Sequence, residues 1–229
     1  MANTFTEVMH TLQGLGNESR RKHNIKSGAG ENQFGVLMGP MRALGKKIGT
    51  DHGLAMELWE SGNTDAMLLS CMVMDPAQLT ASQAESMVKP ITYTVLLDEF
   101  TLGPLCESPA EEELLFRWMP SLEASLGRAG WNLLIARIMA GKKLPFSIED
   151  ILSLLDSGLM AAPKLKQESM NRCLCEIGIR MREYTDRCIK IGEKYGPLDD
   201  RPIPKGCTSS YAPEWIAAGI RLREGRKRK

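Results

Sequence analysis

The stretch GRAGWNLLIARI, residues 127–138, carries the clearest structural pattern of the chain. Its large apolar side chains recur at positions i, i+3, i+4 and i+7, namely Trp131, Leu134, Ile135 and Ile138. Residues at this spacing share one face of an α-helix, so the pattern predicts a helix with a wide apolar stripe. Arg128 stands at the predicted start of this helix.

The same helical period recurs along most of the chain. Apolar stripes at this spacing occupy residues 54–59, 64–72, 111–118, 151–155 and 170–181. Glycine, asparagine, aspartate and proline separate them at short intervals, and runs that indicate strands are nearly absent. About eleven short helices joined by tight turns are typical of stacked antiparallel helix pairs, so we expect an all-α solenoid. No repeat of fixed period is visible, which makes any repeats degenerate.

The chain is predicted to form a single domain over residues 1–218, followed by a basic, flexible tail over 219–229. A length of 229 residues is enough for one well-cored domain or for a continuous array of helical repeats. Three prolines and a glycine between residues 196 and 204 end the main array, and Trp215 marks one short helix beyond them. From Gly225 onward the chain is too charged to pack, so we expect it to fray.

Composition points to a cytosolic protein without a membrane span or a metal centre. No run approaches the roughly eighteen apolar residues that indicate a membrane helix, and the first residues do not resemble a secretory signal. The six cysteines are therefore expected to be free thiols in a reducing compartment. None of the three histidines has a cysteine at zinc-like spacing, and Cys173 and Cys175 form C-x-C rather than C-x-x-C.

Charge is balanced overall but unevenly spread. The 29 basic and 28 acidic residues exclude a histone-like binder that relies on net charge alone. Arg42 and Lys46 stand four residues apart, with Lys47 beside them, so on a helix they would form a face that suits a phosphate group. An ordinary solvated face is the alternative for these three residues. The tail from Arg221 onward is also basic.

A second pattern, TVLLD at residues 94–98, places a carboxylate in an otherwise apolar helix. Thr94 and Asp98 lie at i and i+4 and so share one face. Together with Arg128 on a later helix, Asp98 predicts a site for a cationic or a phosphate-bearing ligand. The alternative for Asp98 is a solvated carboxylate beside Glu99.

An ordered series of short motifs resembles the AlkD-like DNA alkylation repair proteins from about residue 30 to about residue 218. The motifs are FGVLMGPMRALGKKI (34–48), DHGLAMELWESGN (51–63), GRAGW (127–131), MNRCLCEIG (170–178) and GCTS (206–209). The resemblance implies a curved solenoid of HEAT-like repeats whose concave, basic surface holds double-stranded DNA. It also implies a monomer associated with the nucleoid, and a DNA glycosylase that excises alkylated purines without a metal or a cofactor.

By this resemblance, Asp98 matches the catalytic aspartate and Arg128 matches an arginine that grips the DNA backbone. The family places two tryptophans around the lesion. The first of these positions is Thr94 here, with Tyr93 beside it, and the second falls on Arg172. The charged pair therefore fits the family pattern, whereas both aromatic positions are lost.

The loss of both aromatic positions affects how well the site could excise an alkylated base. A carboxylate at Asp98 would stabilise the positive charge that develops on the sugar as the base departs. Each lost tryptophan removes a cation–π contact of about 0.5–2 kcal/mol, which Tyr93 could restore in part only if it turned inward. Arg172 would disfavour a cationic base and favour phosphate. Arg128 could reach a phosphate, or it could pair with the acidic run 111–113.

Three hypotheses therefore remain open from the sequence. The first is a DNA repair glycosylase, a hydrolase that acts through Asp98. The second is a non-catalytic HEAT-like protein that binds duplex or distorted DNA by shape and charge. The third is a protein-interaction scaffold, the commonest use of helical repeats elsewhere.

Overall fold

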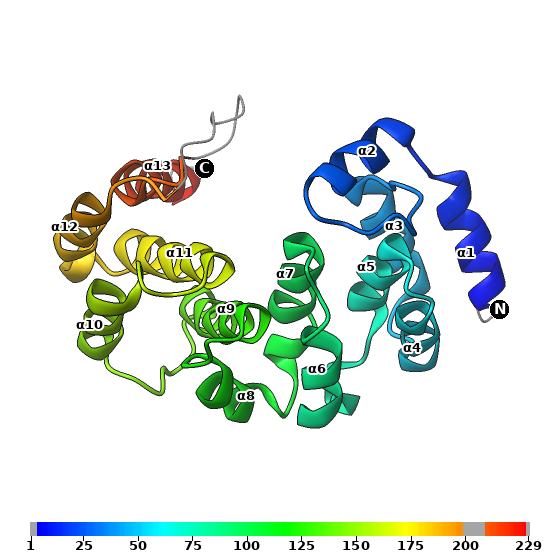
Figure 1. Ribbon diagram of the computed structural model, residues 1–229, viewed down its shortest axis with the longest axis horizontal. Helices are drawn as coiled ribbons and strands as arrows, with labels where there is room; N and C mark the ends of the chain where they lie inside the picture. The colour runs from blue at the N-terminus through cyan, green and yellow to red at the C-terminus, as the bar shows by residue number, and fades with distance from the viewer. Residues whose placement is uncertain (1–3, 199–208, 228–229) are drawn as a thin grey trace. The chain divides into compact units, whose positions relative to one another are not determined.

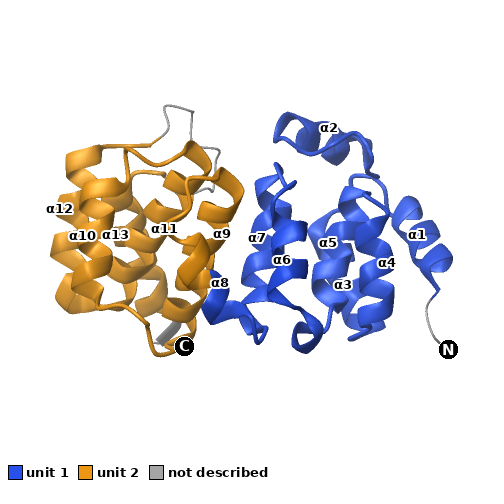
Figure 2. Ribbon diagram, turned by 60° about the horizontal axis from the view of Figure 1, so that its bottom comes forward, with its two compact units in different colours: residues 1–114 blue, residues 115–229 orange. Residues whose placement is uncertain are grey.

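The computed structural model describes residues 4–198 and 209–227, and every regular element in these two ranges is helical (Figure 1). They contain thirteen α-helices and three short 3-10 helices, and no strand. The predicted all-α class is therefore confirmed. The chain divides into two compact units, residues 1–114 and 115–229, and the division falls within helix α8 (Figure 2).

Unit 1 is built around α5, which packs against α3, α4 and α7. Its helices and 3-10 helices are α1 (Phe5–Gly14), α2 (Glu18–Lys26), α3 (Met38–Ile48), α4 (His52–Glu60), α5 (Thr64–Val73), η1 (Pro76–Gln78), α6 (Ala81–Val88), α7 (Thr94–Leu102), η2 (Leu105–Glu107) and the start of α8 (Glu111–Trp118). Leu68, Leu69 and Val73 of α5 are almost fully buried. Helix α5 is thus the core element on which α7 rests.

The loop that leads into α3 is held by one buried carboxylate. Asp65 of α5 accepts backbone hydrogen bonds from Phe34, Gly35 and Val36 at 2.6, 2.9 and 3.0 Å. Gly35 has a φ of +78°, and a Cβ there would lie 2.4 Å from the carbonyl oxygen of Asn17. Only glycine fits this turn, so Gly35 and Asp65 together set the start of α3.

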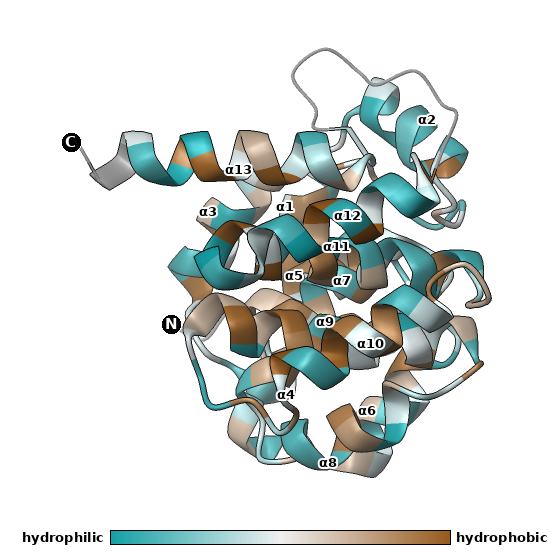
Figure 3. Cartoon of the chain, turned by 90° about the vertical axis from the view of Figure 1, so that its left-hand side faces the viewer, coloured by the Kyte–Doolittle hydropathy of each residue, from teal (hydrophilic) through white to brown (hydrophobic). Residues whose placement is uncertain are grey.

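Unit 2 consists of stacked helix pairs in two layers. Its elements are α9 (Ala124–Ala140), α10 (Ile148–Gly158), α11 (Lys164–Arg180), η3 (Arg182–Tyr184), α12 (Thr185–Tyr195) and α13 (Ala212–Lys227). Helix α11 packs between α9 and α13. Helices α10 and α12 contact each other, and both also contact α11. Figure 3 shows apolar and polar residues alternating around α10 and α12, as expected for helices that bury one face.

Helix α9 begins earlier, and helix α13 extends further, than the sequence indicates. Helix α9 begins at Ala124, so the predicted start at Arg128 was wrong. No side chain caps this end, and the usual sequence signal of a helix start is therefore missing. Gly130 has a packing role, because a Cβ there would lie 2.3 Å from the backbone nitrogen of Met119. Helix α13 continues to Lys227, through most of the predicted tail, and the domain boundary at 218 stays a prediction.

Two further observations concern the residues that the structure describes. No helix there combines the length and the apolar character that a membrane crossing needs. Nor do these residues contain a group of three or more histidine, cysteine, aspartate or glutamate side chains placed to hold a metal ion. The motif at 206–209 lies, apart from Ser209, outside the described residues.

Candidate nucleic-acid interface

Asp98 lies on the half-buried face of α7. Leu97 and Phe100 on the same helix are buried in unit 1, whereas Thr94 and Asp98 both keep part of their surface exposed. The ring of Phe100 packs against Trp59 of α4, with 5.1 Å between the centroids, and this contact anchors α7. The Asp98 carboxylate is therefore carried by a helix with a firmly packed core side.

Arg42 of α3 reaches α7 beside Asp98. Its Nη2 atom lies 3.2 Å from Oε1 of Glu99, and 65% of the Arg42 side chain remains exposed. An exposed pair of this kind contributes only about 0–1 kcal/mol, so the arginine can exchange its partner for a phosphate at little cost. Lys46 and Lys47 are exposed further along α3. Glu99 was missed as a partner because 57 residues separate it from Arg42.

Tyr93 is buried, with only 5% of its surface exposed. Its hydroxyl donates to Oδ1 of Asn24 at 3.3 Å, and Asn24 in turn donates to Oε1 of Gln33 at 2.9 Å. Burial raises the pKa of the Tyr93 hydroxyl, and the nearby charge of Arg20 opposes this shift. The ring thus ties α2 to the start of α7, and its burial withholds it from stacking on a base.

Arg128 is buried inside α9 and joins it to α11. Its Nη1 atom donates to the carbonyl oxygen of Leu165 at 3.1 Å and lies 2.6 Å from Oε2 of Glu168. Only 9% of the Arg128 side chain is exposed, against 48% for Glu168. Local spacing in the sequence does not predict this ion pair, because 40 positions separate Arg128 from Glu168.

A second buried cation, Lys166, lies on α11 directly after Leu165, one of the partners of Arg128. The Lys166 ammonium donates to the carbonyl oxygen of Ser121 at 2.8 Å, and burial lowers the pKa of this lysine. Lys166 and the Arg128–Glu168 pair both attach the first turns of α11 to the segment around α9. This end of α11 is therefore firmly fixed by polar contacts.

Arg172 stands two turns further along α11 and is half-buried. Its Nη2 atom lies 4.0 Å from the sulfur of Met139, an exposed residue at the end of α9. Glu176 and Arg180 follow at steps of four residues, with Arg180 Nε 2.6 Å from Glu176 Oε2. A row of charged side chains therefore occupies the helix face of α11 that carries Arg172.

The predicted residues fall into two groups, one in each unit. Unit 1 brings Arg42 next to the helix of Asp98. It carries six of the predicted residues: Arg42, Lys46, Lys47, Tyr93, Thr94 and Asp98. Unit 2 carries Arg128 and Arg172 on α9 and α11, which pack directly against each other. The spacing of residues 172–180 could have identified Arg180 as well, because it repeats the i, i+4 step.

The stacked antiparallel helix pairs are those of a HEAT-like repeat protein. The chain belongs to the DNA alkylation repair enzyme family, whose family model matches residues 8–216. It is similar to the uncharacterized protein Lin0241 of Listeria innocua, with 24% identity over 220 residues, 93% of this chain and 95% of that protein. Lmo0209 of Listeria monocytogenes, also uncharacterized, is 23% identical over 221 residues and equally covered.

A solved structure resembles nearly the whole chain. Its TM-score is 0.81 and its sequence identity 27%, covering 97% of this chain and 95% of that one. That protein represents a family related to the HEAT-like repeat DNA glycosylases with affinity for branched DNA structures. The AlkD-like resemblance and the HEAT-like fold inferred from the sequence are thereby confirmed.

Proposed function

We propose that this protein binds DNA, branched DNA included, through the shape and charge of the sugar–phosphate backbone and without excising a base. One observation carries the proposal. The position on α11 where the family expects a tryptophan holds Arg172, within a row of charged side chains. The other aromatic position is Thr94, and the adjacent Tyr93 is buried.

A site with an arginine at this place suits phosphate better than a cationic base. Two positive charges about 4 Å apart repel by about 1 kcal/mol in water and by about 4 kcal/mol at the lower effective dielectric of a protein surface. The cation–π contacts that would offset this repulsion are missing. A guanidinium group forms a planar fork that matches a phosphate, so the same residue can hold the DNA backbone.

Sequence-independent affinity would come from exposed cations such as Arg42, Lys46 and Lys47. Contacts of this kind release counterions from DNA and are weakened by salt. A branched junction brings phosphates of several duplex arms close together, which favours a reader of shape over a reader of bases. The affinity of the structural relative for branched DNA supports this choice.

The test compares a four-way DNA junction with a duplex of equal length, by fluorescence anisotropy at several salt concentrations. We expect tighter, salt-sensitive binding of the junction, equal for the wild type and for Asp98→Asn. We also expect no release of 7-methylguanine from methylated duplex DNA by either protein. Absence of binding to both DNAs at low salt would overturn the proposal and favour a protein-interaction scaffold.

A second candidate function is hydrolysis of the N-glycosidic bond of alkylated purines in duplex DNA. It is favoured by Asp98, the aspartate that matches the family pattern and stands half-exposed on α7. A carboxylate there would stabilise the oxocarbenium-like sugar and orient the attacking water. Release of 7-methylguanine by the wild type that disappears in Asp98→Asn would establish this function in place of the first.

A further inference from the structure

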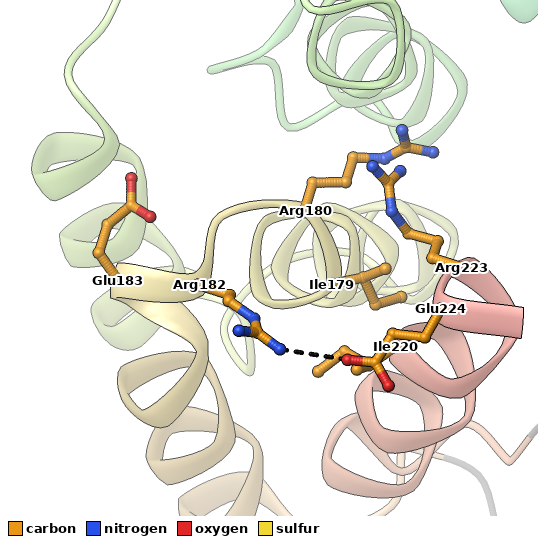
Figure 4. A pocket seen from close by; sticks show the side chains of 7 residues that line it. All are labelled: Ile179, Arg180, Arg182, Glu183, Ile220, Arg223 and Glu224. Carbon is orange, nitrogen blue, oxygen red and sulfur yellow. Dashed lines mark hydrogen bonds and ion pairs between the residues drawn. The ribbon is translucent and has the colours of Figure 1, made fainter. Parts of the chain in front are cut away.

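Unit 2 contains a charged pocket that none of the predicted site residues lines. It has a volume of about 610 Å³ and opens between the end of α11, η3 and α13 (Figure 4). Three arginines and two glutamates surround two isoleucines, Ile179 and Ile220. The arginines outnumber the glutamates in this lining, which favours an anion as the ligand.

The charges in this pocket are unequally compensated. Arg182 pairs with Glu224, with 3.1 Å between Nη2 and Oε1. Arg180 is fixed through Glu176 at 2.6 Å and through the carbonyl oxygen of Met139 at 3.3 Å. Arg223 is half-buried, and it forms no hydrogen bond or ion pair within the part of the chain that the structure describes.

Two guanidinium groups converge at the rim of the pocket. Figure 4 shows the side chains of Arg180 and Arg223 pointing toward one another, whereas Arg182 and Glu224 meet on the other side and Glu183 points away. Two like charges repel at short range, and an anion between them turns this repulsion into attraction. Two arginine forks can together surround the oxygens of one phosphate.

We propose that Arg180 and Arg223 bind one phosphodiester group of a DNA backbone. The inference rests on the proposed function and extends it, because it assigns unit 2 a contact to a DNA strand at a place apart from Arg128. Glu224 also lines this pocket, and its negative charge would compete with the phosphate for Arg223. Arg182 holds Glu224 by an ion pair and so acts as a positioning residue that leaves Arg223 available.

The experiment measures binding of the full chain to a labelled four-way junction by anisotropy over a range of salt concentrations. Arg223→Gln is compared with Arg221→Gln, which removes the same charge from an exposed position of α13 that does not line the pocket. We expect Arg223→Gln to weaken binding about tenfold and Arg221→Gln about twofold. The slope of log K against log salt should fall by about 0.9 for the one lost phosphate contact. Thermal unfolding checks that both variants keep the fold.

The positioning role of Arg182 has its own readout. Arg182→Gln should weaken binding about threefold, because Glu224 is then free to pair with Arg223. Glu224→Gln should strengthen binding, and adding it to Arg182→Gln should restore the affinity. A purely structural role for Arg182 would not be rescued by a second substitution.

The outcomes separate this inference from the function on which it rests. If the unchanged chain binds neither junction nor duplex at low salt, both are overturned. If it binds, and Arg223→Gln behaves like Arg221→Gln in affinity and in salt slope, only the phosphate site on unit 2 is overturned.

Discussion

The guanidinium group of Arg128 lies 2.6 Å from the carboxylate of Glu168 and joins α9 to α11. The arginine is buried and the glutamate is half exposed, so the two partners are unequal. Loss of a charged partner is costly for a buried cation, whereas the glutamate alone would be solvated. Within unit 2 the pair therefore contributes to the packing of the helices that also carry Arg172.

Removal of the carboxylate should expose this cost. We expect Glu168→Ala to lower the free energy of unfolding by about 2 kcal/mol. This loss is smaller than the loss expected for a fully buried pair, because Glu168 is half exposed. The exposed Arg42–Glu99 pair is the matched control, and Glu99→Ala should cost less than about 1 kcal/mol. Urea denaturation of both variants measures the difference. Equal losses would show that burial of Arg128 does not set the strength of its ion pair.

Asp65 should be among the most sensitive positions of unit 1. Asp65→Asn keeps the size of the side chain but replaces an acceptor oxygen by a donor group, which then faces a backbone N–H. We expect a loss of about 3 kcal/mol, since hydrogen bonds to a charged acceptor contribute more than neutral ones. Thermal unfolding checks this. Asp75→Asn, at the partly exposed cap of η1, serves as the control and should have a small effect.

Local signals in the sequence predicted the elements well. The apolar period identified the helices, and the capping residues Thr80 and Ser147 stand directly before α6 and α10. These signals act within four residues along the chain, which is why they can be read without a structure. They also predicted that Thr94 and Asp98 share a face of α7.

Partners that are distant in sequence could not be predicted in this way. Glu168 follows Arg128 by 40 residues, and Asn24 precedes Tyr93 by 69. Both contacts depend on which helices pack together, and a degenerate repeat gives no fixed period from which to derive that packing. The burial of Tyr93, and hence its withdrawal from the candidate interface, became visible only with the fold.

Close approach of the backbone explains one glycine of the stretch at 127–138. A Cβ at Gly130 would lie 2.3 Å from the nitrogen of Met119, so Gly130→Ala must push α9 away from the segment before it. We expect a loss of about 3 kcal/mol, the upper part of the usual range for overpacking. Gly39 of α3 has no neighbour within 4 Å, and Gly39→Ala should stabilise by about 0.5–1 kcal/mol. Chemical denaturation of the pair tests whether space, rather than helix propensity, decides the sign.

Alkaline pH should destabilise the protein from about pH 9 upward. Burial raises the pKa of the Cys71, Cys173 and Cys175 thiols above their usual value of 9.0, and that of Cys188 to about 12. The unfolded chain loses these protons near pH 9, whereas the folded chain keeps them. The stability that the neutral thiols contribute is therefore complete below pH 9 and is lost as the pH rises toward the folded pKa values.

Each such thiol contributes a slope of up to about 1.4 kcal/mol per pH unit in this range. Lys166 acts in the opposite direction, because burial lowers its pKa and the fold gains relative stability as this lysine loses its proton below pH 10.5. Urea denaturation between pH 8 and 10.5, with reductant present, measures the net slope. Cys188→Ala should make the slope of stability against pH shallower by the contribution of one thiol. This change in slope is separate from any loss of stability that the variant shows at pH 8. A slope identical to that of the unchanged chain would mean that Cys188 ionises equally in the folded and unfolded states.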